Sequence, residues 1–107
     1  MSSWVIEYSE AALKDLKSLD GSQQILVKKA IRKVSQNPVS EQEGGLGKPL
    51  GNHNNSDLVG CYKIKLRKAG IRVVYRLKIV DNKMRIIIIG MREDVYTEAK
   101  KRLSKGE

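Results

Sequence analysis

Two neighbouring segments of this chain alternate apolar and basic side chains, and this pattern constrains the fold more than any other feature. In residues 61–67, every second side chain is apolar and those between are Lys63, Lys65 and Arg67. The same division recurs in residues 71–80 around Arg72, Arg76 and Lys78. A period of two is typical of β-strands that bury one face. The segments therefore predict two strands, each with an apolar face and a basic face.

The short connection between these segments, through residues 68–70, predicts an antiparallel hairpin with a defined register. A connection of two or four residues keeps the two apolar faces together, whereas a connection of three residues does not. Lys63, Lys65 and Arg72 then share a face. Like charges on neighbouring strands repel each other, so this arrangement predicts an anionic partner.

The positive charge of the chain is concentrated in its second half. The formal net charge is +9; residues 1–56 contribute +1 and residues 57–107 contribute +8. No acidic residue occurs between Leu58 and Val80. A one-sided basic surface favours a polyanion, and nucleic acid is favoured over a membrane because no amphipathic lipid-seeking segment is present.

Hydrophobic periodicity and turn residues predict the other elements. These are a strand at residues 4–8, a helix capped by Ser9 and ended by Asp20-Gly21, a helix stopped by Asn37-Pro38, a loop at 38–60, a strand at 83–91, and a helix begun by Asp94 with Val95, Ala99 and Leu103 towards the core. The order β-α-α-β-β-β-α predicts one α+β domain over residues 1–107. It has a single, mostly antiparallel sheet with two N-terminal helices and one C-terminal helix.

The N-terminal sequence has no basic region followed by a long apolar run, so we expect a cytoplasmic protein without a membrane partner. The single cysteine, Cys61, has no partner for an internal disulfide, and its simplest interpretation is a small core residue. His53 is the only histidine and lies in a polar run, so we expect it on the surface. A nuclease built on two histidines is excluded by this count.

Two runs resemble the RelE toxins. The run GCYKIKLRKAGIRVVYR, residues 60–76, is similar to their central hairpin, and GMREDVYTEAKKRL, residues 90–103, is similar to their last strand and terminal helix. The element order is that of the RelE/ParE superfamily. This resemblance implies the toxin of a toxin-antitoxin system, a ribosome-dependent endoribonuclease that cleaves mRNA with Lys, Arg and Tyr side chains, and a cognate antitoxin protein that inhibits it.

The resemblance also implies which residues form the site. Carried over to this sequence, the catalytic set is Lys63, Lys65, Arg72, Arg92 and Tyr96. Lys48, in GKPL, is a weaker match to a further basic residue near the substrate. The set expected to bind RNA is Lys48, Arg67, Lys68, Arg76 and Lys100. Two features depart from the family pattern: the segment between Arg92 and Tyr96 is about two residues shorter, and a long loop rich in Gly and Asn precedes Cys61.

These residue types suit cleavage of RNA by its own 2′-hydroxyl, which needs a base, stabilisation of the phosphorane and an acid at the leaving oxygen, but no metal or cofactor. Neighbouring cations favour the neutral form of a lysine, so Lys65 or Lys63 is the candidate base. Arg72 offers a planar fork to the phosphate oxygens. The family suggests an acid role for Arg92, and Tyr96 is placed to stack on a nucleobase.

Other interpretations of the same residues stay open. Alternating lysines on a strand are often a solvated face. Arg92 is also placed to pair with Glu93 or Asp94 at the start of a helix, and Tyr96 to pack in the core. At the level of function, the alternatives are a ParE-like toxin that inhibits DNA gyrase without cleaving anything, and a plain RNA-binding module.

Overall fold

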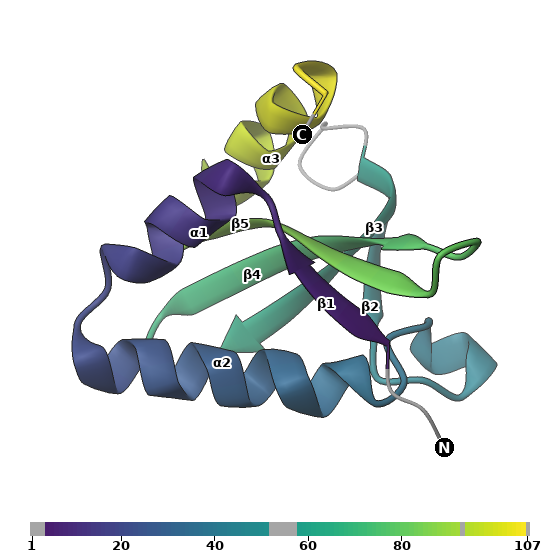
Figure 1. The fold of residues 1–107 in the computed structure, drawn as a ribbon, viewed down its shortest axis with the longest axis horizontal. Helices are drawn as coiled ribbons and strands as arrows, with labels where there is room; N and C mark the ends of the chain where they lie inside the picture. Colours follow the sequence, from purple (N-terminus) through teal and green to yellow (C-terminus); the bar gives the residue numbers. More distant parts are fainter. Residues whose placement is uncertain (1–3, 52–57, 93, 107) are drawn as a thin grey trace.

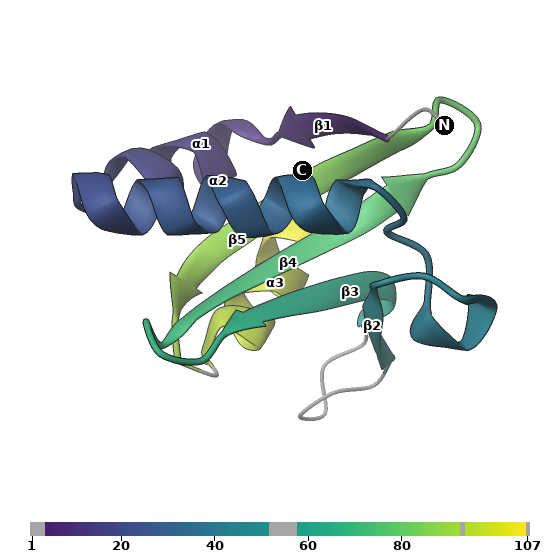
Figure 2. The same cartoon turned by 90° about the horizontal axis from the view of Figure 1, so that it is seen from below.

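The computed structural model describes residues 4–51, 58–92 and 94–106, which form a sheet with helices on both faces (Figure 1). The strand order is β1-β5-β4-β3-β2, with β1 parallel to β5 and the other pairs antiparallel. The strands are β1 (Val5–Tyr8), β2 (Lys48–Gly51), β3 (Leu58–Leu66), β4 (Ile71–Lys78) and β5 (Lys83–Met91). Helices α1 (Glu10–Lys17) and α2 (Gly21–Ser35) lie on one face and α3 (Asp94–Ser104) on the other (Figure 2). The predicted α+β class is confirmed.

Polar side chains define where the first two helices begin. The Ser9 hydroxyl accepts a hydrogen bond from the backbone N–H of Ala12 at 3.1 Å, which confirms the predicted cap. Asp20 starts α2 with a capping box, since its carboxylate accepts from the N–H of Gln23 at 2.8 Å while the Gln23 side chain accepts from the N–H of Asp20. Helix α1 ends three residues earlier, at Lys17 with Ser18 as its C-cap, so only a short connection separates the two helices.

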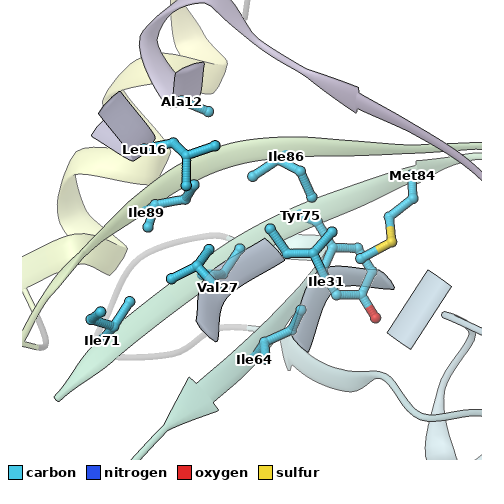
Figure 3. Close-up of a cluster of buried hydrophobic side chains, with 11 residues drawn as sticks. Ala12, Leu16, Val27, Ile31, Ile64, Ile71, Tyr75, Met84, Ile86 and Ile89 are labelled. Carbon is cyan, nitrogen blue, oxygen red and sulfur yellow. The ribbon is translucent and has the colours of Figure 1, made fainter. Parts of the chain in front are cut away.

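The larger core lies between the helix pair and the sheet (Figure 3). Leu16 of α1 and Val27 and Ile31 of α2 pack against apolar side chains of the sheet. Tyr75 is fully buried there, and its hydroxyl donates to the carbonyl of Pro38 at 2.8 Å. This hydrogen bond links the segment after α2 to the middle of β4. It also satisfies the Tyr75 hydroxyl, a polar group that burial would otherwise leave unpaired.

Strand β5 contributes side chains to a hydrophobic core on each face of the sheet. A register shift opposite Val74 and Tyr75 interrupts its alternation, so Ile86 and Ile89 belong to the core under α1 and α2. Ile87 and Ile88 belong to a second core with α3. The run of four isoleucines is therefore covered on both faces of the sheet.

The sequence prediction differs from the structure at two places. The segment predicted as a loop at 38–60 contains a 3-10 turn (Glu41–Glu43), the strand β2 and the first residues of β3. A four-residue strand that contains a proline and ends in glycine gives little periodic signal, and such a strand is tolerated at a sheet edge. The strand predicted over residues 71–80 ends at Lys78, and Ile79 is 77% exposed beyond it. His53 lies outside the described residues.

Side chains, rather than a strand, cover the outer edge of β5 beyond β1. The pairing of β1 with β5 ends at Tyr8 and Ile86. Beyond that point the Asp15 carboxylate of α1 accepts from the N–H of Ile89 at 3.0 Å, and the Arg102 guanidinium of α3 donates to the carbonyl of Ile87 at 2.9 Å. Asp15 and Arg102 also pair with each other at 2.7 Å. This ion pair joins α1 to α3 around the edge of the sheet.

Candidate active site

The strand register brings the predicted cations into two adjacent rows on the face that also carries α3. Lys65 of β3 lies opposite Arg72 of β4, which in turn lies opposite Gly90 of β5. In the next row, Lys63 of β3 lies between Lys48 of β2 and Val74 of β4. The connection between β3 and β4 has four residues, as the face-matching argument required. The predicted cluster of Lys63, Lys65 and Arg72 is therefore confirmed as a spatial arrangement.

The surroundings of Lys63 lower its pKa. Partial burial is the main cause, and the positive charges of Lys65 and Lys48 come next, followed by a hydrogen bond with Lys65 and the charge of Arg72. All of these disfavour the ammonium form. Among the described residues, no ion pair involves Lys63, Lys65 or Arg72. The cluster thus retains its positive charge and holds one lysine that loses its proton more readily than usual.

Arg72 faces a hollow at the end of the β3–β4 hairpin. The hollow has a volume of about 250 Å³ and is lined by Lys65, Leu66, Arg67, Gly70, Ile71 and Arg72. The Arg72 side chain is half-buried, and its Nε is buried without a hydrogen-bond partner among the described residues. A buried donor without a partner is costly unless a ligand satisfies it. A phosphate oxygen is the acceptor that this guanidinium in a basic hollow suits best.

Arg92 follows β5 and adopts a left-handed backbone conformation. Its φ is 68°, and its side chain is exposed. Few residues other than glycine adopt this conformation, and residues that do are concentrated at functional sites. Its neighbour Met91 pairs with Ile71, so the backbone of Arg92 leaves the sheet beside the start of β4. This places Arg92 at the same end of the sheet as Arg72.

Tyr96 is fully buried in the second core, together with Val95 and Ala99 of the same helix. This burial agrees with the alternative interpretation, in which Tyr96 packs in the core, and not with a ring exposed for stacking. Leu50 of β2 and Leu58 of β3 belong to the same cluster, and they widen the buried face of α3 beyond the stripe that helical spacing predicts. A nucleobase would reach the Tyr96 ring only if this cluster opened.

Of the residues predicted to bind RNA, some lie near the cluster of Lys63, Lys65 and Arg72 and others lie away from it. Lys48, Arg67 and Lys68 are exposed around the cluster. Arg76 is exposed on the same face but about 13 Å along β4 from Arg72, at the usual rise of a strand. Lys100 is exposed on α3.

Glu7 of β1 neutralises much of the far end of the basic face. Its carboxylate pairs with Arg85 at 2.6 Å, with Lys83 at 3.5 Å and with Lys78 at 3.6 Å. The hydrogen bond from Arg85 is the main reason that the pKa of Glu7 lies below its usual value. The uncompensated charge is consequently concentrated at the end that carries Arg72.

Comparison with known proteins agrees with this fold. The family model of the ParE toxin of type II toxin-antitoxin systems, parDE, matches residues 6–96. The mRNA interferase toxin RelE of Escherichia coli K12 is 32% identical over 104 residues, which cover 94% of this chain and 97% of that protein. The chain belongs to the RelE/ParE toxin family.

Solved structures place it in the RelE branch. The isolated E. coli RelE toxin superposes with a TM-score of 0.68 at 31% identity and covers 94% of this chain and 99% of its own. RelE in the intact E. coli RelBE toxin-antitoxin complex gives a TM-score of 0.64 at 28% identity, covering 85% and 99%. Among the described residues of this RelE-family chain, no helix is long and apolar enough to cross a membrane.

Proposed function

We propose that this RelE-family toxin is an endoribonuclease that cleaves mRNA in the ribosomal A site and thereby inhibits translation. The observation that carries the proposal is the cluster of Lys63, Lys65 and Arg72, which forms without any acidic partner among the described residues. The name of the E. coli relative, mRNA interferase, supports the same activity. A site of this charge suits the phosphodiester backbone of RNA.

The proposed reaction is attack of a 2′-hydroxyl on the adjacent phosphate, which leaves a 2′,3′-cyclic phosphate. Lys63 is the preferred base, because its lowered pKa leaves more of its neutral form available near neutral pH. Arg72 holds the nonbridging oxygens and stabilises the charge of the phosphorane. Lys65 adds to that stabilisation, and Arg92 donates the proton to the leaving 5′-oxygen. Side chains supply every step, so no metal or cofactor enters the proposal.

The proposed role of Tyr96 is to stack on a displaced nucleobase, and its burial sets a condition on this role. The ring lies within the cluster of Leu50, Leu58 and Val95. Stacking therefore requires that ribosome or RNA binding opens this cluster. A contribution of Tyr96 to the packing of α3 is the alternative, and a Tyr96→Phe variant that cleaves normally would favour it.

The proposed partners are mRNA, the ribosome and a cognate antitoxin, and the proposed compartment is the cytoplasm, where ribosomes translate. The E. coli RelE relative is found in a complex named toxin-antitoxin complex RelBE, which supports an antitoxin for this chain. An acidic amphipathic segment that folds on binding suits a basic surface with apolar grooves. Such a partner would silence the toxin by occupying or reshaping its basic face.

The rival function is inhibition of DNA gyrase without cleavage, which the description of the matching family model as a ParE toxin favours. The retention of Lys63, Lys65, Arg72 and Arg92 supports the nuclease instead. A single experiment separates the two. The protein is added to ribosomes that carry a defined mRNA and an empty A site, and in parallel to the same RNA free in solution and to a gyrase supercoiling reaction.

Cuts confined to the A-site codon are the expected result. Intact mRNA together with stalled gyrase would overturn the proposal in favour of the ParE-like function. Equal cutting of free and ribosome-bound RNA would retain the nuclease and remove its dependence on the ribosome. RNA binding without any cleavage would indicate a plain binding module.

A further inference from the structure

A second basic hollow lies beside the cluster, between α2 and the outer edge of β3. Strand β2 pairs with β3 only from Leu58 to Lys63, so no strand of the described chain covers the edge of residues 64–66. The groove at this place has a volume of about 320 Å³. It is bounded by α2 on one side and by Lys48, the first residue of β2, and residues of β3 on the other.

The groove combines an apolar wall with four lysines. Its apolar residues are Ala30 and Val34 of α2, Leu46 before β2, and Ile64 of β3. Its lysines are Lys33 of α2, Lys48 of β2, and Lys63 and Lys65 of β3. No acidic residue lines it, and no ion pair among the described residues involves any of these four lysines. Leu46 is 44% exposed, so the apolar wall is accessible.

The groove is continuous with the candidate active site through shared residues. Lys65 lines both this groove and the hollow that holds Arg72, and Lys63 belongs to both the groove and the catalytic cluster. A chain of phosphates that crosses the cluster therefore has a basic path on either side of Lys65. Lys33, which the sequence pattern assigns to a solvated helix face, is brought to this path from α2.

We propose that this groove binds the nucleotide next to the scissile phosphodiester, with its base against the Leu46 wall and its phosphate on Lys33 and Lys48. The inference rests on the proposed function and adds Lys33 and Leu46 to the residues that position the substrate. Single-stranded RNA is bound in this way elsewhere: lysines follow the backbone and apolar or aromatic side chains contact splayed bases. The volume lies at the lower end of small-ligand pockets, about 300–1,000 Å³, which suits one nucleotide rather than a folded segment.

An acidic peptide is the other occupant that this chemistry allows. The nucleotide is favoured because two of the four lysines also belong to the cluster around Arg72, so one RNA strand satisfies both sites at once. An acidic peptide would need to place separate carboxylates in each. The shared lysines make the groove an extension of the substrate path rather than an independent surface.

The test uses the full chain and a non-cleavable RNA pentanucleotide with a 2′-deoxy sugar at its centre. Amide resonances of the ¹⁵N-labelled protein are followed by NMR during titration, and affinity is measured by fluorescence anisotropy at several salt concentrations. Shifts are expected at Ala30, Lys33 and Leu46 as well as in the β3–β4 hairpin. Lys33→Glu should weaken binding about three- to tenfold more than Lys17→Glu, a matched charge change on α1, and flatten the salt slope by about 0.7, the value for one lost phosphate contact of a single strand. Leu46→Ala should weaken binding at an unchanged salt slope.

Each outcome separates the groove from the catalytic proposal. Equal weakening by Lys33→Glu and Lys17→Glu, with no shift of the groove amides, would overturn the groove even if programmed ribosomes are cut. A protein that cuts no RNA but shows the Lys33-dependent binding would keep the groove and remove the nuclease. A glutamate-rich peptide that binds the groove more tightly than the RNA, and displaces it, would reassign the groove to a protein partner.

Discussion

Arg72 is the residue whose environment most directly asks for an anionic ligand. Arg72 lies between Lys65 of β3 and Gly90 of β5, and its Nε is buried without a partner among the described residues. Lysine presents a point charge in place of a planar fork, so it would supply attraction without the paired hydrogen bonds. A lysine at position 72 would therefore keep the positive charge but not the function of the arginine.

We predict that Arg72→Ala lowers the cleavage rate on programmed ribosomes by about 100- to 1,000-fold, the usual effect of removing one donor from a developing oxyanion. Arg72→Lys should recover only part of the loss. Both variants should melt close to the parent temperature, because Arg72 makes no ion pair among the described residues. The rate is measured in single-turnover reactions by primer extension. Lys14→Ala is the control, and a normal rate for Arg72→Ala would contradict the assignment.

We predict that cleavage becomes faster as the pH rises and levels off at a lower pH than an ordinary lysine base would allow. The neutral form of Lys63 acts as the base, and burial together with Lys65 and Lys48 lowers its pKa. Lys48→Ala removes one of these charges, so the pKa should rise and the inflection should move to higher pH. The measurement is the pH profile of the single-turnover rate at saturating ribosome. An inflection that does not move, or that moves equally in Lys17→Ala, would remove Lys63 as the base.

The site residues whose positions the sequence could predict are those that depend on strand register. Faces alternate with a fixed period, so the sequence alone places Lys63, Lys65 and Arg72 on one face, as the structure does. The burial of Tyr96 and the arrival of Lys33 depend on how helices pack across the sheet. The sequence of a helix shows which of its side chains form an apolar stripe. It does not show which other elements pack beside that stripe and bury further side chains.

The C-terminal part of α3 is fixed by an ion pair between Arg102 and Asp15, in addition to the apolar packing of the helix. The side chains of Arg102 and Asp15 are 14% and 20% exposed, and both also satisfy backbone groups of β5. Glu98 adds a longer contact to Arg102 at 3.6 Å. Because α3 also carries Tyr96, this ion pair fixes one boundary of the candidate site.

We predict that Asp15→Ala lowers the free energy of unfolding by about 3 kcal/mol, since it leaves a largely buried guanidinium without its main partner and the N–H of Ile89 without its acceptor. Chemical denaturation gives the value. Lys17→Ala, an exposed residue of the same helix, should stay within about 0.5 kcal/mol of the parent. A loss below about 1 kcal/mol for Asp15→Ala would show that the pair is less important than its burial suggests.

The elements that the sequence predicted well are those with long periodic runs or strong caps. Ser9 begins a helix as expected, and strands lie near residues 61–67, 71–80 and 83–91 as predicted. Asp20 was predicted only as part of a helix end, whereas it caps the start of α2. Strand β2 was missed because a proline and a glycine hide its period. The register shift in β5 was missed because four successive isoleucines look the same on either face.

For the molecule as a whole, the distribution of charge is more important than its total. Glu7 neutralises cations at one end of the basic face, whereas none of the described acids pairs with the cluster at the other end. This asymmetry orients a polyanion before contact, because uncompensated charges attract it over about a Debye length. We therefore expect RNA to bind mainly at the end of the basic face that carries Arg72.

We predict that binding of a short single-stranded RNA falls with salt at a logarithmic slope of about −3.5, which corresponds to five phosphate contacts. The five cations are Lys33, Lys48, Lys65, Arg67 and Arg72, whereas Lys63 acts as the base. Doubling the salt should then weaken binding about tenfold. Anisotropy titrations at several salt concentrations give the slope. Lys65→Ala should flatten it by about 0.7, whereas Lys14→Ala should leave it unchanged, and an equal effect of both would indicate attraction by net charge alone.

The side chains that cover the outer edge of β5 also protect the protein from itself. A bare strand edge offers N–H and C=O groups to a strand from another molecule and so seeds aggregation. Here Asp15 and Arg102 already occupy the groups of Ile89 and Ile87, which leaves an incoming strand nothing to bond at these positions. Breaking the pair should therefore promote self-association through this edge, visible by light scattering at concentrations where the folded fraction is still high.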